Sequence, residues 1–173
     1  MLFAARFLEQ LHDNSRKIRV DGRQFSIYIA PVGSDQGVLL AYEGGLVRVV
    51  DGIYEWRKDG ARKTPFFVHL RSSDPFGLAG IWCLQRATEG TPIVTCAILT
   101  CGANELMAQI HNRMPVILLP GVRERWLDAN TDPGDLRGML KPLPSEELDA
   151  YPVSPFVNSP RHDSPECIRR VGA

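Results

Sequence analysis

The chain has 173 residues, with 20 basic and 20 acidic side chains and a formal net charge of zero. This length suits one domain with a real core, and the zero charge excludes a global field that attracts nucleic acid or membrane, so any basic surface must be local. No window approaches the roughly 18 apolar residues of a membrane span, and the N-terminal sequence lacks a secretory signal pattern, so we predict one cytoplasmic domain over residues 1–173 without membrane contact.

The first half of the chain predicts mostly strands. Spacing in "ARFLEQLHD" predicts a short amphipathic helix over residues 5–13. Alternation in "QFSIYIAP" predicts a strand over 24–31, and two apolar runs around Gly44-Gly45 predict a hairpin over 37–52. A second hairpin is expected from "IYEWRK" and "TPFFVHL", because Asp59-Gly60 between them is a strong turn dipeptide.

The second half predicts buried strands and then short helices. Residues 77–84 and 92–100 are short, apolar runs typical of core strands. Helical spacing predicts helices over 103–111 and 122–128, whereas the Pro, Gly and acidic residues of 130–155 predict a lightly structured loop. The sequence therefore predicts an α+β fold with many short strands and a few covering helices.

Cysteine and histidine spacing gives no sign of a metal site, a disulfide framework or a cofactor motif. The four cysteines lack a CxxC pair, so we predict reduced, structural thiols, and the four histidines are far apart without ligand spacing. These residues are Cys83, Cys96, Cys101, Cys167, His12, His69, His111 and His162.

Glu55 is a carboxylate inside a run that otherwise predicts a strand. On a period-two strand it shares the face of Ile53 and Arg57, opposite Tyr54 and Trp56. One interpretation is a half-exposed strand in which Glu55 pairs with Arg57 or another cation. The other is a carboxyl lowered into a cleft, where desolvation raises its pKa toward that of a useful general acid or base.

His111 raises a similar choice, because it lies at the end of a predicted helix and just before Pro115 and a buried strand. It is either a capping histidine or a site residue placed at an element boundary.

Cations and aromatic side chains alternate around the second hairpin. Such a mixture suits single-stranded nucleic acid, because cations follow phosphates and rings stack on bases, although a solvated turn has the same composition. The residues concerned are Tyr54, Trp56, Arg57, Lys58, Arg62, Lys63, Phe66 and Phe67.

The order and wording of these segments resemble the SRAP family, the SOS response-associated peptidases. The matching segments occur in the family's order; they are "VVDGIYEWRKDGARKTPFFVHL", "GLAGIWC", "CAILTCGANELMAQIHNRMPVILLP", "WLD" and "PVSPFVNSPRHDSPECI". The DG-x-[FY]-EW and I-H-x-R-x-P motifs are the most specific of these segments. Residues 46–173 match the family well, whereas residues 1–45 diverge from it.

The resemblance implies barrel-like, largely antiparallel β-sheets around a cleft for single-stranded DNA with abasic sites, acting as a monomer. In the family, self-processing removes the initiator methionine, and the N-terminal cysteine exposed in this way crosslinks to the abasic sugar. By motif match, Glu55 is the acid/base carboxyl, His111 assists proton transfer, Thr100 lies close to the lesion and Arg113 borders it.

The first 45 residues depart from the family pattern. Members start Met-Cys-Gly-Arg, whereas this sequence starts Met1-Leu2-Phe3-Ala4, and the family's tryptophan-bearing wedge and Asn-Ala-Arg stretch have no counterpart. A displaced start, a deletion or loss of function explains this equally well. Three hypotheses remain: an active sensor that uses an amine, a catalytically inactive single-stranded DNA-binding remnant, and an incomplete fragment.

Overall fold

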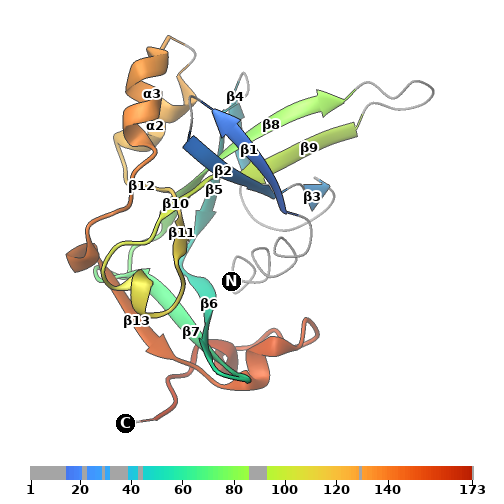
Figure 1. Cartoon of the computed structure of the whole chain (residues 1–173), viewed down its shortest axis with the longest axis vertical. Coiled ribbons are helices and arrows are strands. Elements are labelled where there is room, and N and C mark those ends of the chain that lie inside the picture. The colour runs from blue at the N-terminus through green and yellow to red at the C-terminus, as the bar shows by residue number, and fades with distance from the viewer. Residues whose placement is uncertain are drawn as a thin grey trace.

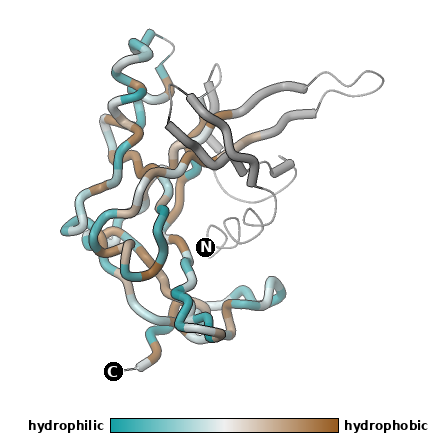
Figure 2. Tube along the Cα trace, viewed as in Figure 1, coloured by the Kyte–Doolittle hydropathy of each residue, from teal (hydrophilic) through white to brown (hydrophobic). Residues whose placement is uncertain are grey.

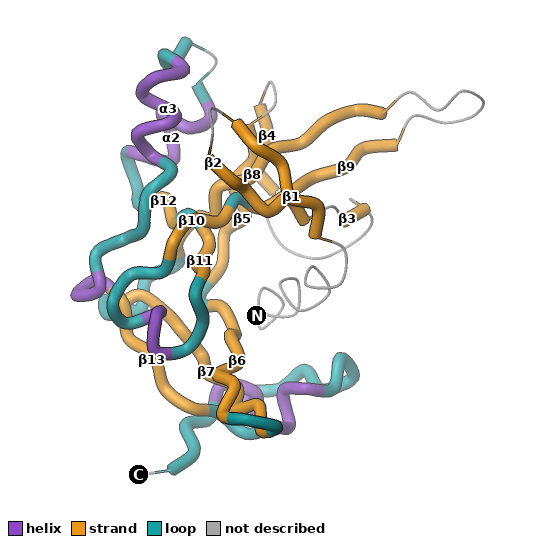
Figure 3. Tube along the Cα trace, viewed as in Figure 1, coloured by secondary structure: helices purple, strands orange, loops and turns teal. Residues whose placement is uncertain are grey.

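The computed structural model describes residues 15–20, 23–28, 30–31, 39–42, 45–85, 93–128 and 130–172, and their side chains over 45–81, 96–128 and 130–172. Within these ranges every strand pairing is antiparallel, and strands outnumber the short helices (Figure 1, Figure 3). The predicted α+β class is confirmed. The sheets formed by the described strands stay open and do not close on themselves.

The largest sheet has six strands in the order β3-β9-β8-β5-β4, with β12 also paired to β8. Its strands are β3 (Ala30–Pro31), β4 (Leu39–Tyr42), β5 (Gly45–Val50), β8 (Phe76–Gln85), β9 (Ile93–Ile98) and β12 (Ile117–Leu118). The hairpin predicted over 37–52 is confirmed by β4 and β5, and the two predicted core strands correspond to β8 and β9.

A three-stranded sheet contains the DG-x-[FY]-EW motif. Its order is β13-β7-β6, formed by β6 (Ile53–Asp59), β7 (Arg62–Leu70) and β13 (Leu148–Pro152). β6 and β7 form the predicted hairpin, and Gly60 takes φ +62° at its tip, a conformation that glycine adopts without steric cost. β6 is thus an edge strand of this sheet.

Two short ladders complete the strands. One joins β1 (Ser15–Val20) to β2 (Arg23–Tyr28), and β2 with β3 confirms the strand predicted over 24–31. The other joins β10 (Thr100–Gly102) to β11 (Arg113–Pro115). The loop between β10 and β11 ends near His111, so this ladder determines where that ring lies.

The helices are short. They are α2 (Val122–Leu127), α3 (Pro133–Met139) and the 3-10 helices η1 (Met107–Gln109), η2 (Ser145–Glu147), η3 (Pro155–Asn158) and η4 (Pro165–Ile168). Figure 1 shows α2 and α3 at one end of the molecule and the three-stranded sheet with the C-terminal segment at the other. In Figure 2 hydrophilic residues are frequent along α3 and the C-terminal segment. No helix among the described residues is long and apolar enough to cross a membrane.

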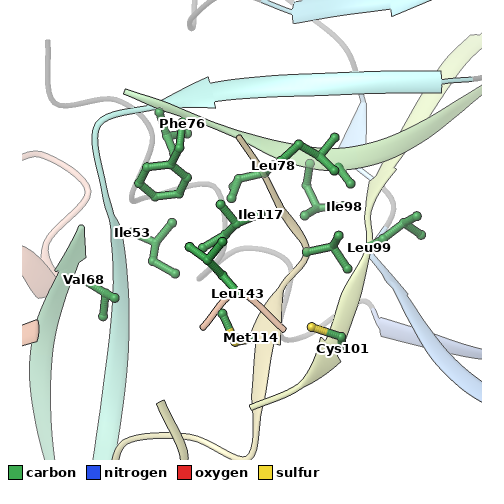
Figure 4. Packing of buried hydrophobic residues seen from close by; sticks show 14 of the residues in the cluster. Ile53, Val68, Phe76, Leu78, Ile98, Leu99, Cys101, Met114, Ile117 and Leu143 are labelled. Carbon is green, nitrogen blue, oxygen red and sulfur yellow. The ribbon is translucent and has the colours of Figure 1, made fainter. Parts of the chain in front are cut away.

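The main hydrophobic core joins the large sheet to the three-stranded sheet and to the β10–β11 ladder. Ile53 and Val68 of the three-stranded sheet pack in one cluster with Phe76, Ile98 and Met114 (Figure 4). Each such side chain contributes about 1.5–3 kcal/mol when it is fully buried. This shared core fixes the relative positions of the elements that carry Glu55 and His111.

α2 is fastened to the large sheet through Trp126. Its indole Nε1 donates to the carbonyls of Leu46 and Gly80, both at 3.2 Å, and the ring is buried. The helix predicted over 122–128 is therefore confirmed, and the "WLD" segment has a structural role.

The helix predicted over 103–111 is wrong. It contains only a single turn of 3-10 helix, η1. Asn104 lies before this turn, and its side chain accepts from the backbone N–H of Met107, as a residue that caps a helix start does. The chain then turns back, since the backbone N–H of Ala103 donates to the carbonyl oxygen of Asn112 and β11 begins at Arg113.

The loop predicted over 130–155 is also wrong in part. α3 begins at Pro133 after Asp132, whose side chain accepts from the N–H of Gly134, which is a normal helix start. β13 then pairs with β7. The helix predicted over 5–13 lies outside the described residues.

Candidate functional site

Glu55 lies on β6 and points to the main core side of the three-stranded sheet. It pairs across the strands with Phe66, and Ile53 on the same face belongs to the main cluster, whereas Tyr54 belongs to a second cluster on the opposite face. The predicted division of this strand into two faces is confirmed. Only 9% of Glu55 is exposed, which excludes the half-exposed interpretation.

The environment of Glu55 favours its protonated form. Burial raises its pKa above the ordinary 4.5, and the nearby His111 and a hydrogen bond with the backbone of Trp56 oppose this rise. Desolvation is the largest of these effects. A raised pKa makes such a carboxyl a more available proton donor than an ordinary surface carboxylate.

His111 follows η1 and precedes β11, so it lies at an element boundary as predicted, although no α-helix precedes it. Its Nδ1 lies 3.2 Å from the backbone nitrogen of Arg113 and 3.2 Å from that residue's carbonyl oxygen. When Nδ1 accepts from the N–H, the hydrogen of the neutral ring is on Nε2. This half-buried ring lies near enough to Glu55 to lower the pKa of its carboxyl.

Thr100 and Arg113 are held together by the β10–β11 ladder. The Arg113 guanidinium Nη2 donates to the carbonyl oxygen of Thr100 at 2.6 Å and to its Oγ1 at 2.8 Å. Thr100 is buried and Arg113 half-buried. The structure therefore joins these two predicted site residues to each other, on the two strands that flank the His111 loop.

The neighbouring Cys101 does not resemble a reactive thiol. It is buried, and burial raises its pKa to about 11, with the Arg113 charge opposing the rise. Cys96 and Cys167 are also buried, which agrees with the predicted structural thiols. The side chain of Cys83 lies outside the described residues.

The four hairpin cations divide between the two faces of the sheet. Arg57 pairs with Thr64 and Arg62 with Asp59 on the face of Glu55, whereas Lys58 and Lys63 face each other on the opposite side. The predicted cluster is therefore not one surface.

Arg57 is held in place on the Glu55 face. Its Nε donates to Asp59 Oδ2 at 3.0 Å, and its guanidinium carbon lies 5.0 Å from the centre of the Phe66 ring. Because Phe66 is the cross-strand partner of Glu55, the stacked guanidinium extends the Glu55 face toward the hairpin tip.

Trp56 lies on the face opposite Glu55. Its indole Nε1 donates to Oδ1 of Asn158 at 2.9 Å, and its ring packs with the second cluster beside Tyr54. The structure therefore uses this indole to bind the C-terminal segment to β6, and its predicted contact with DNA stays a prediction.

A separate groove of about 370 Å³ runs between α2, α3 and the segment that follows α3. It shares no residue with the Glu55 and His111 site. Its walls are Ile117, Leu119, Val122, Arg125, Gly134, Asp135, Gly138, Met139, Lys141, Pro142, Leu143 and Pro144. Among the residues with described side chains, no three His, Cys, Asp or Glu converge to hold a metal ion.

The model of the family "SOS response associated peptidase (SRAP)" matches residues 44–160. The chain belongs to the SRAP family. The match contains Glu55, His111 and all the other predicted site residues, and the resemblance predicted from the DG-x-[FY]-EW and I-H-x-R-x-P words is confirmed.

Relatives and solved structures agree with SRAP membership. Abasic site processing protein YoqW of Bacillus subtilis is 44% identical over 120 residues, covering 68% of this chain and 54% of the relative. Abasic site processing protein HMCES of chicken is 34% identical over 155 residues, covering 74% and 46%. A crystal structure of a Bacteroides thetaiotaomicron protein has TM-score 0.68 and 28% identity, covering 74% of this chain and 57% of that one. The chain thus spans about half the length of the curated relatives it matches.

Proposed function

We propose that this chain binds single-stranded DNA at an abasic site and assists imine formation between an amine of the protein and the aldehyde of the abasic sugar. SRAP membership and the relatives named abasic site processing proteins support this reaction class. The observation that carries the proposal is the buried Glu55 carboxyl with its raised pKa beside His111.

Glu55 is suited to donate a proton during dehydration of the carbinolamine, a step for which an ordinary surface carboxylate is a poor donor. Addition of an amine to an aldehyde gives a carbinolamine, and loss of its hydroxyl as water needs a proton donor. A carboxyl with an ordinary pKa is almost fully ionised near pH 7, whereas burial keeps more of Glu55 in the protonated form. The nearby His111 offsets part of the cost of leaving the resulting carboxylate buried, since it lowers the pKa of Glu55.

The DNA strand is proposed to lie along the Glu55 face. Thr100 and Arg113 border the lesion, and Arg57 and Arg62 contact the phosphates, because both arginines share the face of Glu55. Trp56, Lys58 and Lys63 lie on the opposite face, so their proposed contribution to binding is smaller.

The test is a denaturing gel of the protein incubated with a single-stranded oligonucleotide that carries one abasic site, with and without borohydride. Glu55→Gln is compared with Glu105→Gln, which removes an exposed carboxylate from the loop before His111. We expect the wild type and Glu105→Gln to be trapped equally and Glu55→Gln to be trapped more slowly by a factor of about 10² to 10⁴.

Each lane pattern has a distinct meaning. An adduct that requires borohydride supports an imine, and a heat-stable adduct without it supports a nucleophile that closes the imine. Equal trapping of Glu55→Gln and wild type overturns the role of Glu55. If no adduct forms in any lane, the covalent chemistry is refuted and the chain is at most a DNA-binding member of its family.

A further inference from the structure

The loop that ends at His111 is tied to a distant segment by Asn104. Asn104 Nδ2 donates to the carbonyl oxygen of Leu143 at 2.8 Å, while its Oδ1 accepts from the backbone N–H of Met107 at 2.8 Å. A second link runs in parallel, because the backbone N–H of Leu106 donates to Oγ of Ser145 at 3.4 Å. The loop is therefore fastened to residues 143–145 at two adjacent points.

These bonds continue to His111 itself. The backbone N–H of His111 donates to the carbonyl oxygen of Met107 at 2.8 Å, and Met107 is fully buried in the main core. Three hydrogen bonds thus connect the carbonyl of Leu143 to the backbone of His111 by way of Asn104 and Met107. A rigid chain of this kind transmits a displacement at either end to the other.

The segment that receives Asn104 leads directly into the sheet that carries Glu55. Leu143 is buried in the main core, η2 follows it, and β13 begins at Leu148. β13 pairs with β7, and β7 pairs with β6. Asn104 therefore links the His111 loop to the Glu55 sheet through its bonds to Leu143 and Met107, not through a bond to the His111 ring or the Glu55 carboxyl.

We propose that Asn104 is a positioning residue that sets the location of His111 relative to Glu55 by bridging the His111 loop to the segment before β13. The inference rests on the proposed function of the Glu55 and His111 pair. A primary amide suits this role because it donates in one direction and accepts in the other, and aspartate, alanine and serine cannot supply both at the same reach.

The test compares Asn104→Ala, Asn104→Asp and Gln109→Ala. Aspartate keeps an acceptor for Met107 but loses the donor for Leu143 and brings a carboxylate toward that carbonyl. Gln109 is the matched control, because its side-chain amide also bonds within this loop, to the carbonyl of Glu105, but is exposed and reaches no other segment.

The first measurement is the titration of the Glu55 carboxyl carbon by NMR in the full chain without DNA. Because the nearby His111 lowers the pKa of Glu55, displacement of His111 should raise that pKa further in both Asn104 variants and not in Gln109→Ala. The second measurement is the rate of borohydride trapping beside the affinity for an oligonucleotide without a lesion. We expect trapping to fall about tenfold or more with affinity kept within about twofold.

The outcomes separate this inference from the proposed function. If the wild type forms no adduct, the function fails, and the Glu55 titration alone still tests Asn104. A Glu55 titration and trapping rate equal to wild type in Asn104→Ala overturn the inference. If Asn104→Ala loses its cooperative thermal transition, Asn104→Asp and Ser145→Ala decide the question, and a wild-type Glu55 titration in both overturns it.

Discussion

Replacing Gly52 by alanine is expected to destabilise the chain and disturb the strand that carries Glu55. Gly52 immediately precedes β6, and a Cβ built on it lies 2.2 Å from Cζ of Phe67 and 2.5 Å from Cε2. To reach an ordinary contact at 3.4 Å from 2.2 Å, the ring and strand must separate by about 1.2 Å. Phe67 has little room, since it is 7% exposed and its ring centre lies 5.4 Å from that of Tyr54 and 5.8 Å from that of Tyr151.

The size of the effect follows from overpacking. Forcing one extra carbon into a filled core costs about 1–3 kcal/mol, and the lower entropy of the unfolded alanine chain offsets roughly 0.4–1 kcal/mol. For a chain of this length each kcal/mol moves Tm by about 2–4 °C. The net cost is about 0–2.6 kcal/mol, so we expect Gly52→Ala to lower Tm by up to about 10 °C.

Thermal unfolding of a double-mutant cycle measures this. Phe67→Leu alone destabilises, but in that background Gly52→Ala should cost at least about 1 kcal/mol less than in the wild type, because the obstructing ring atoms are gone. Gly138→Ala is the control, since nothing lies within 4 Å of its Cβ position and a helical alanine is favoured. An equal cost of Gly52→Ala in both backgrounds would refute the clash with Phe67.

Three further changes test the site and the core. Burial makes the folded chain bind the Glu55 proton more tightly than the unfolded chain does, so wild-type stability falls as pH rises past 4.5. Glu55→Gln should therefore gain Tm relative to wild type as the pH rises above 4.5, and a pH-independent difference contradicts the burial argument. Arg57→Ala should weaken single-stranded DNA binding and reduce the slope of log K against log salt concentration by about 0.7, whereas Lys58→Ala on the other face should have a smaller effect. Equal losses of affinity in the two variants would refute the assigned face. Trp126→Phe should cost about 1–3 kcal/mol in chemical denaturation, because two buried carbonyl acceptors lose their indole donor, and an unchanged midpoint contradicts that anchoring role.

Local sequence patterns predicted the hairpins because the forces that form them are local. Asp59-Gly60 permits the turn, and period-two alternation fixes which face of β6 holds Glu55. The signal for the start of α3 is also local, since Asp132 followed by Pro133 is a normal N-cap and first helical residue. The helix was not predicted because the composition of the surrounding segment favoured a loop.

Other features depend on contacts between distant segments. β13 forms only because Leu148 meets Leu70 on β7, 78 positions earlier in the chain, and its own sequence carries little alternation. The segment with helical spacing before His111 forms only one turn of 3-10 helix, and its Asn104 side chain donates to the carbonyl of Leu143, a partner that periodicity does not reveal. The available signal was Asn104 itself, since asparagine favours helix starts and turns over helix interiors.

The burial of Glu55 also depends on contacts between distant segments. A period-two pattern assigns the face on which a side chain lies, but not how deeply that side chain is buried. Residues on both sides of the site pack in the main core: Ile53 and Phe66 beside Glu55, and Met107 and Ile110 before His111. The core that stabilises the fold therefore also sets the separation of carboxyl and imidazole, since neither element can shift without disturbing shared packing. A substitution among these apolar residues should consequently alter the titration of Glu55 as well as stability, which links the acid/base behaviour of the site to its hydrophobic support rather than to the polar residues alone.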